Sequence, residues 1–141
     1  DQSLIEPIAN VLKGLGSRHV MVVHSADGLD ELSIADKTFI AELKGGVVTT
    51  YSIHPKELGF GLGNLNDIKA DDAEGSLSLI KEAFSGQNGT AKDIISLNAG
   101  AAIYVSGLTT SLQSGVDRAN QVLSNGSAQH KLDEYVKASN G

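Results

Sequence analysis

Three carboxylates lie within five consecutive positions of the sequence, at Asp27, Asp30 and Glu31. They follow residues 18–23 (RHVMVV), whose apolar run from Val20 to Val23 predicts a buried strand opening into an acidic loop. In open α/β sheets, ligands bind where strands end in loops. Adjacent carboxylates such as Asp30 and Glu31 repel each other unless they are solvated or share a cation, and Mg²⁺ often bridges one or two carboxylates to substrate phosphates. The pattern predicts a metal or phosphate site, with a solvated turn as the alternative.

Other polar residues near this loop favour structural roles. The loop lacks the EF-hand pattern, because the third position counted from Asp27 is Leu29 rather than an oxygen ligand. His24 is expected to pack at the strand end, since Mg²⁺ prefers oxygen. Asn98 falls within an apolar stretch, where its amide needs hydrogen-bond partners. We expect Asn98 to bond two segments together in preference to contacting substrate.

The periodicity of apolar residues predicts the elements that position these side chains. We expect strands over residues 19–24, 37–43 and 47–53, the last two forming an antiparallel pair around Gly45-Gly46. Helices are expected over residues 4–15, 73–84, 90–105, 111–123 and 127–138. The helix over 90–105 is apolar nearly all round, which predicts a central helix against the sheet and beneath the last two helices. The segment 59–64 (GFGLGN) fails the G-x-G-x-x-G pattern, so we interpret it as a flexible connection.

Composition sets the class of protein. The chain has 141 residues, enough for one compact domain with a core. Its net charge is −6 and it has no Lys/Arg cluster, which argues against a nucleic-acid partner or an anionic membrane surface. Its apolar runs are shorter than the roughly 20 residues that cross a bilayer. It has no cysteine, which excludes disulfides and thiolate metal sites. Without a recognisable signal peptide, we expect a cytoplasmic location.

Several segments together resemble the C-terminal part of the anthranilate phosphoribosyltransferase family, over essentially the whole chain. The most specific is 27–33 (DGLDELS), followed by 97–102 (LNAGAA). The remainder are 6–16 (EPIANVLKGLG), Val22-Val23-His24, Ile53 to Pro55, and Gly107, in the order and rough spacing of the family. The chain begins at Asp1 and its only Met is Met21, so it reads as a piece of a longer protein or a processed chain.

The resemblance implies a fold class and an activity. The fold would be α/β, the C-terminal portion of a phosphoribosyltransferase/nucleoside-phosphorylase-like α/β domain, with one buried strand plus an antiparallel strand pair covered by about five helices. Residues 1–141 would form a partial domain, lacking the N-terminal helical domain and the pyrophosphate-loop half. The family transfers the phosphoribosyl group of phosphoribosyl pyrophosphate (PRPP) to anthranilate in tryptophan biosynthesis, and forms a homodimer through the helical domain.

The resemblance assigns Mg²⁺ binding to Asp30 and Glu31, and places no catalytic or cofactor-binding residue in this chain. The residues that hold pyrophosphate and anthranilate in the family lie upstream, so the chain alone is expected to be inactive. Two loops depart from the family pattern: Ser25 stands where Gly is common, and residues 69–75 lack a double Gly. Neither departure touches the acid pair.

Three alternatives stay open. One is a nucleoside-phosphorylase-like relative with another specificity, which the acid pair disfavours because pyrimidine phosphorylases use inorganic phosphate. Another is a non-catalytic relative that binds nucleic acid, which the charge of −6 disfavours. The third is a free-standing acidic binding module.

Overall fold

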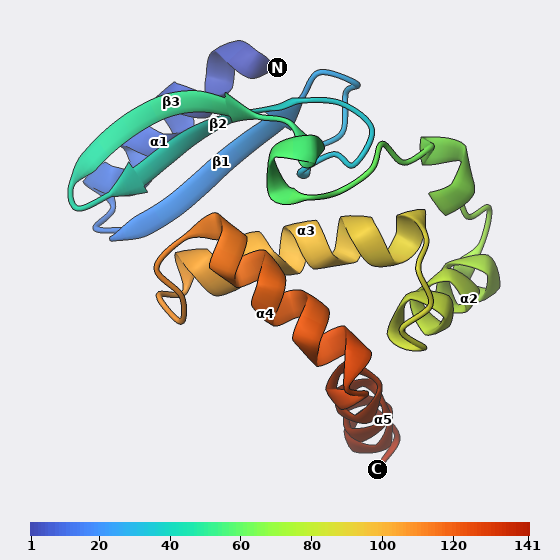
Figure 1. The fold of residues 1–141 in the computed structure, drawn as a ribbon. Coiled ribbons are helices and arrows are strands. Elements are labelled where there is room, and N and C mark those ends of the chain that lie inside the picture. Colours follow the sequence, from blue (N-terminus) through green and yellow to red (C-terminus); the bar gives the residue numbers. More distant parts are fainter.

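A computed structural model describes all residues, 1–141, and arranges them in three layers (Figure 1). Helix α1 (Ile5–Gly14) covers one face of a sheet, and helices α3 (Thr90–Val105) and α4 (Leu112–Ser124) cover the other. Helices α2 (Ala73–Phe84) and α5 (Ser127–Asn140) lie beyond α3 and α4, away from the sheet. Short 3₁₀ helices span Gln2–Leu4, Pro55–Leu58 and Leu65–Ile68. The five expected α-helices are confirmed.

The sheet has three antiparallel strands, β1 (His19–Ser25), β2 (Thr38–Lys44) and β3 (Val47–Ile53), in the order β1-β2-β3. The hairpin between β2 and β3 turns at Gly45 and Gly46, which both have positive φ values and so favour glycine. β1 was expected to be buried, yet only Ser25 of its residues is buried and the others are half-buried. The reason is its place at the sheet edge, since it pairs with β2 alone. β2, in the centre, is the most buried strand.

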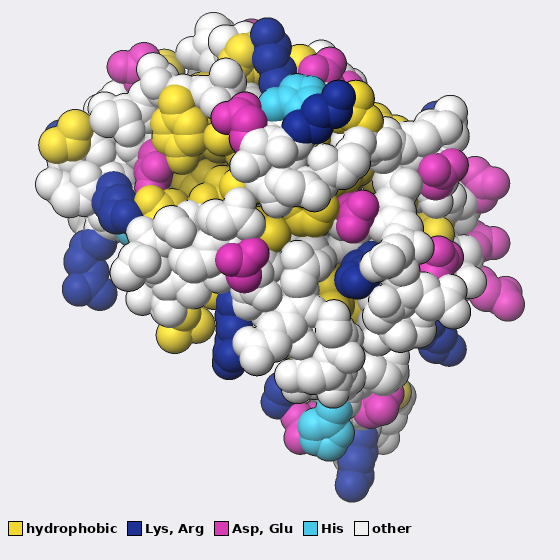
Figure 2. All heavy atoms as spheres, viewed as in Figure 1, with side chains coloured by type: hydrophobic (Ala, Val, Ile, Leu, Met, Phe, Trp, Pro, Cys, Tyr) yellow, Lys and Arg dark blue, Asp and Glu magenta, His cyan; other side chains and the backbone are white.

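Alternate side chains of the sheet enter two cores. Ile40 of β2 joins the larger core with residues from α3, α4 and the acidic loop, and Met21 and Val23 of β1 pack against it. Ala41 faces the other way, into a smaller core with Ile5 and Ala9 of α1. Figure 2 shows hydrophobic side chains gathered in the hollow between the sheet and helices α3 and α4.

Helices α3 and α4 pack with their backbones almost in contact. A Cβ atom built on Gly115 would lie 2.2 Å from the carbonyl oxygen of Gly100, and one on Gly100 would lie 2.6 Å from the Cα atom of Val116. Glycine is therefore required at both positions by close approach. The small residues of α3 do make a close helix contact, as expected.

The central-helix prediction holds only in part. Six residues of α3 are buried, Gly100 and Leu97 among them, but Ala99 and Ala101 are half-buried and Ala102 is exposed. The last helix was expected to lie over α3, and this was wrong: α5 packs against α4 and α2 and has no buried residue. Its sequence between Ser127 and Asn140 is too polar to bury a broad face.

The segment between β3 and α2 is more structured than the flexible connection we expected. Leu58, Phe60 and Ile68 pack against the larger core. Gly63 donates its N–H to the carbonyl of Ile34 at 3.0 Å, and a Cβ atom there would lie 2.6 Å from Thr90 Cγ2. Gly63 thus serves packing, not the binding of a phosphate.

Candidate functional site

The acidic loop connects β1 to β2 and is closed by its own hydrogen bonds. Asp27 accepts the Leu29 N–H at 3.2 Å on one oxygen and the Ser33 hydroxyl on the other. The backbone N–H of Ser25 donates to the carbonyl of Leu29 at 3.1 Å, and Ala26 N–H donates to the carbonyl of Lys37 at 3.0 Å. These contacts give the loop a fixed shape, and they make Asp27 a structural residue.

The charge of Asp27 is stabilised by the same bonds. Partial burial raises the pKa of its carboxyl, but hydrogen bonds, among them those from the Ser33 hydroxyl and the Leu29 N–H, outweigh burial, so the net pKa lies below its usual value. Ser33, which is buried, also accepts the N–H of Ala35 at 2.9 Å. A single hydroxyl therefore links both halves of the loop.

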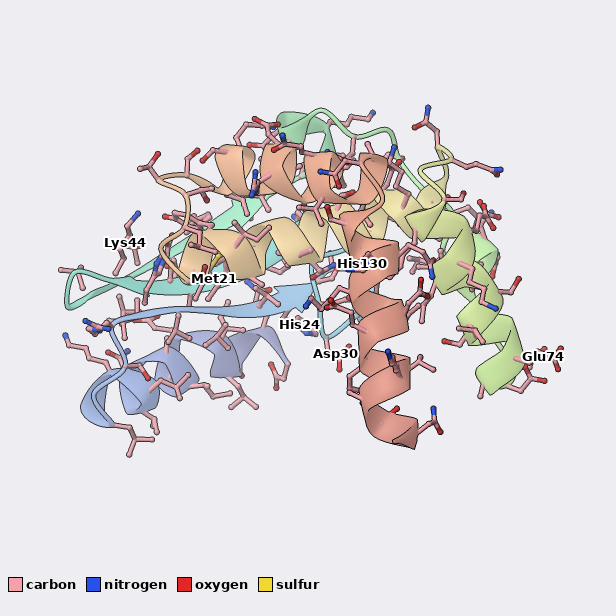
Figure 3. All side chains as sticks on the ribbon, turned by 90° about the horizontal axis from the view of Figure 1, so that it is seen from below. Met21, His24, Asp30, Lys44, Glu74 and His130 are labelled. Carbon is pink, nitrogen blue, oxygen red and sulfur yellow. The ribbon has the colours of Figure 1, made fainter.

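Asp30 and Glu31 lie on the outer part of the loop, and both are exposed. Neither forms an ion pair with Lys, Arg or His. Figure 3 shows Asp30 near His24, at the end of β1, whereas Lys44 marks the opposite end of the sheet. The pair thus lies in the loop that follows this strand, and its assignment as a metal site stays a prediction. The convergence of the two carboxylates on one ion stays a prediction.

Glu31 occupies a less polar setting than Asp30. It lines a cavity of about 480 Å³ between α3, α2 and the segment before α2. The other lining residues are mostly apolar: Ile68, Ser76, Leu79, Ile80, Ala91, Ile94, Ile95, Asn98 and Ala99. Partial burial, together with the neighbouring charge of Asp30, raises the pKa of the Glu31 carboxyl above its usual value. A cation placed between the two acids would relieve this unfavourable charge.

The donor set fits Mg²⁺ as an open site. No group of three or more His, Cys, Asp or Glu side chains lies together that could hold a metal ion. Two carboxylates are nevertheless what Mg²⁺ uses when substrate phosphates and water complete its coordination. Asp30 and Glu31 could therefore hold a magnesium ion shared with a phosphorylated ligand, but they could not form a closed, all-protein site.

Asn98 connects α3 to the acidic loop. Its Oδ1 accepts the N–H of Leu32 at 2.9 Å, and its Nδ2 donates to the carbonyl of Leu32 at 2.9 Å and to that of Ile94 at 3.0 Å. The expected bond between segments is confirmed. The sequence predicted that the Asn98 amide needs hydrogen-bond partners. It could not show that the partner is Leu32, which is 66 positions away.

A second polar cluster, which the sequence did not predict, lies between the sheet and the end of α3. Glu42 accepts hydrogen bonds at 2.7 Å from the hydroxyls of Tyr51 and Tyr104, and His19 Nε2 lies 2.8 Å from its carboxylate. Lys44 donates to Tyr104 at 2.9 Å. Burial raises the pKa of Glu42, but these partners outweigh it and the net pKa is lowered. Its members are fully paired with one another, so the cluster stabilises the fold.

Comparisons with known proteins place this chain in a family. Residues 1–129 match the family model described as "Glycosyl transferase family, a/b domain". An anthranilate phosphoribosyltransferase of Ruthia magnifica is 61% identical over 138 residues, covering 98% of this chain and 41% of the relative. The enzyme of that name from Marinomonas sp. is 51% identical over 137 residues, covering 96% and 40%. The chain thus spans about 40% of the length of the relatives it matches.

Solved structures agree in fold. The crystal structure of anthranilate phosphoribosyltransferase from Thermus thermophilus superposes with a TM-score of 0.87 at 32% identity, covering 97% of this chain and 40% of that one. The enzyme of Saccharomyces cerevisiae in complex with PRPP and Mg gives a TM-score of 0.72 at 22% identity over 84% of this chain and 34% of that one, a likeness of fold alone. No helix of this chain has the length and apolar character needed to cross a membrane. The resemblance found in the sequence is confirmed, and the chain belongs to the glycosyl transferase family as part of its a/b domain.

Proposed function

We propose that the complete protein transfers the phosphoribosyl group of PRPP to the amino group of anthranilate, releasing pyrophosphate. The observation that carries this proposal is the 61% identity, across 98% of the chain, to a relative named for that activity. Within the proposal, residues 1–141 form a partial domain whose contribution to the site is the acid pair. A homodimer and a cytoplasmic location, which are typical of the family, belong to the same proposal.

The chemistry of the acid pair suits this reaction. Departure of pyrophosphate builds negative charge on the leaving group, and Mg²⁺ would neutralise that charge without a proton transfer. Asp30 and Glu31 would hold the ion. This role for Asp30 and Glu31 is supported by the absence of any Lys or Arg partner that would neutralise them instead.

The test neutralises the pair in the complete protein. Asp30→Asn with Glu31→Gln is expected to cripple turnover at limiting Mg²⁺ while the circular dichroism spectrum stays unchanged. The matched control is Asp133→Asn with Glu134→Gln, which makes the same two changes in an Asp-Glu pair exposed on α5. Unchanged steady-state rates for the first double variant would refute the assignment.

A second experiment tests whether residues 1–141 have any activity without the rest of the protein. Purified residues 1–141 are expected to show no transfer activity, because the chain has no basic cluster, and its glycine-rich segment 59–64 lacks the G-x-G-x-x-G pattern of a phosphate-binding loop. The readout is the loss of anthranilate fluorescence with PRPP and Mg²⁺ present. Consumption of anthranilate by the 14.7 kDa chain alone would overturn this part of the proposal.

A further inference from the structure

Asn98 makes an unusual pair of contacts with the residue that follows the acid pair. One side-chain amide both accepts the N–H and donates to the carbonyl of Leu32, each at 2.9 Å. The second hydrogen of Nδ2 goes to the carbonyl of Ile94 in the previous turn of α3. The amide is thereby fixed to its own helix and to the loop at the same time.

The Leu32 side chain anchors the same point in a second way. It is 1% exposed and belongs to the larger core, together with Ile94 and Leu97 of α3. Both the backbone and the side chain of Leu32 are therefore held against this helix. The acids themselves, Asp30 and Glu31, are exposed and have no comparable anchor.

Planarity of the peptide bond carries this restraint to Glu31. The N–H of Leu32 lies in one rigid plane with the carbonyl carbon and the Cα atom of Glu31. Fixing that N–H and the Leu32 side chain therefore fixes the point from which the Glu31 side chain extends. Asp30 is one residue further, about 3.8 Å away along the trace of Cα atoms.

A carboxamide is the group that this place requires. It offers an acceptor oxygen and two N–H donors, and the three contacts engage the oxygen and both hydrogens. An aspartate would keep the acceptor but would face two carbonyl oxygens without a hydrogen to give. An aliphatic side chain would leave both the N–H and the carbonyl of Leu32 without the partner that Asn98 supplies.

We propose that Asn98 is a positioning residue for metal binding: by clamping Leu32 to α3, it holds Asp30 and Glu31 at the separation that one divalent cation requires. This inference rests on the proposed function, because it takes the acid pair as the Mg²⁺ ligands. Two neighbouring carboxylates repel each other, so without the clamp the loop relaxes in the direction that separates them. Bringing the two carboxylates back together then costs part of the free energy of ion binding, so the ion binds more weakly.

The experiment measures binding of Mn²⁺, the paramagnetic substitute for Mg²⁺, to the complete protein by electron paramagnetic resonance. Asn98→Ala is expected to weaken Mn²⁺ binding about 10-fold, as for other residues that orient metal ligands. In the anthranilate-fluorescence assay, the Mg²⁺ concentration that gives the half-maximal rate of Asn98→Ala should also rise about 10-fold. Its kcat at saturating Mg²⁺ should stay near that of the unmodified protein. The matched control is Asn120→Ala, which removes an Asn on α4 that accepts a hydrogen bond from Ser96 of α3, away from the loop.

The outcomes separate this inference from the proposed function. If Asp30→Asn with Glu31→Gln binds Mn²⁺ as the unmodified protein does, the metal assignment itself fails. If that double variant loses binding but Asn98→Ala binds as tightly as Asn120→Ala, the positioning role is wrong. Should Asn98→Ala not fold, Asn98→Gln replaces it with the same expectation, because it keeps the amide but displaces it by one methylene. Unchanged Mn²⁺ binding by Asn98→Gln would then overturn the inference.

Discussion

Gly115→Ala should destabilise the protein, although alanine is the better helix former. Gly115 lies inside α4, where its missing side chain lets the backbone of α3 approach. Helix propensity alone would favour alanine by about 1 kcal/mol. The prediction therefore depends on whether the steric cost exceeds that gain.

The structure gives the size of the steric cost. A Cβ atom on Gly115 would lie 2.2 Å from the Gly100 carbonyl oxygen, where real Cβ atoms stay at least 3.0 Å away, so the helices must separate locally by about 0.8 Å. A gap of that size forfeits a quarter to a half of the dispersion energy at each affected contact. The obstacle is backbone, which cannot rotate away, so the cost belongs at the upper end of overpacking, about 3 kcal/mol. Subtracting the propensity gain leaves a net loss of about 2 kcal/mol.

Urea unfolding followed by circular dichroism at 25 °C measures this loss. The control is Gly14→Ala at the end of α1, where a Cβ atom would meet nothing within 4 Å. Gly14→Ala should be neutral or stabilise by up to about 1 kcal/mol, because it gains propensity without a clash. A Gly115→Ala variant at least as stable as the unmodified protein would refute the argument that the helices are in backbone contact.

Three further predictions concern the charged side chains. Glu31→Gln should raise the melting temperature of the metal-free protein at pH 7. The pKa of Glu31 is raised in the folded state, so its negative charge destabilises the fold above that pKa. The gain in melting temperature should therefore fade as the pH falls through the folded-state pKa of Glu31. Ser33→Ala should cost about 1–3 kcal/mol in urea unfolding and, in an NMR titration, raise the pKa of Asp27 toward its ordinary value. Glu42→Gln should cost about 2 kcal/mol at pH 7. Because the folded-state pKa of Glu42 is lowered, its carboxylate stabilises the fold above the unfolded pKa near 4.5, so the difference should shrink as the pH falls below that value. Equal acid sensitivity of the Glu42→Gln variant and the unmodified protein would contradict the last prediction.

Much of the secondary structure was predictable because local signals agree with packing. The bounds expected for α2 and α3 match those observed, 73–84 and 90–105. Asp72 caps α2 by accepting the N–H of Gly75, and Gly86 adopts a positive φ just after the helix ends. Signals of this kind lie within a few residues and can be read without knowing the fold.

Burial and partners across the chain were harder to predict, because they depend on which surfaces meet. The sequence of β1 is apolar on both faces, and nothing local shows that it lies at a sheet edge. Tyr104 and Glu42 are 62 positions apart, so their hydrogen bond has no local signature. The acid pair, by contrast, was proposed because Asp30 and Glu31 are adjacent and because the surrounding segment resembles the family, and its role as a metal site stays a prediction.

The edge position of β1 has a practical consequence for handling this chain. Its outer backbone groups have no strand partner, and its sequence, HVMVVHS, has no acidic residue, no lysine and no proline to discourage pairing. A seven-residue segment of high β propensity and low charge is the type that seeds intermolecular sheets. Purified on its own, the chain should self-associate in a concentration-dependent way, first through this edge. A charged residue introduced at an outward position of β1 would then be a more direct route to a well-behaved sample than a change of buffer.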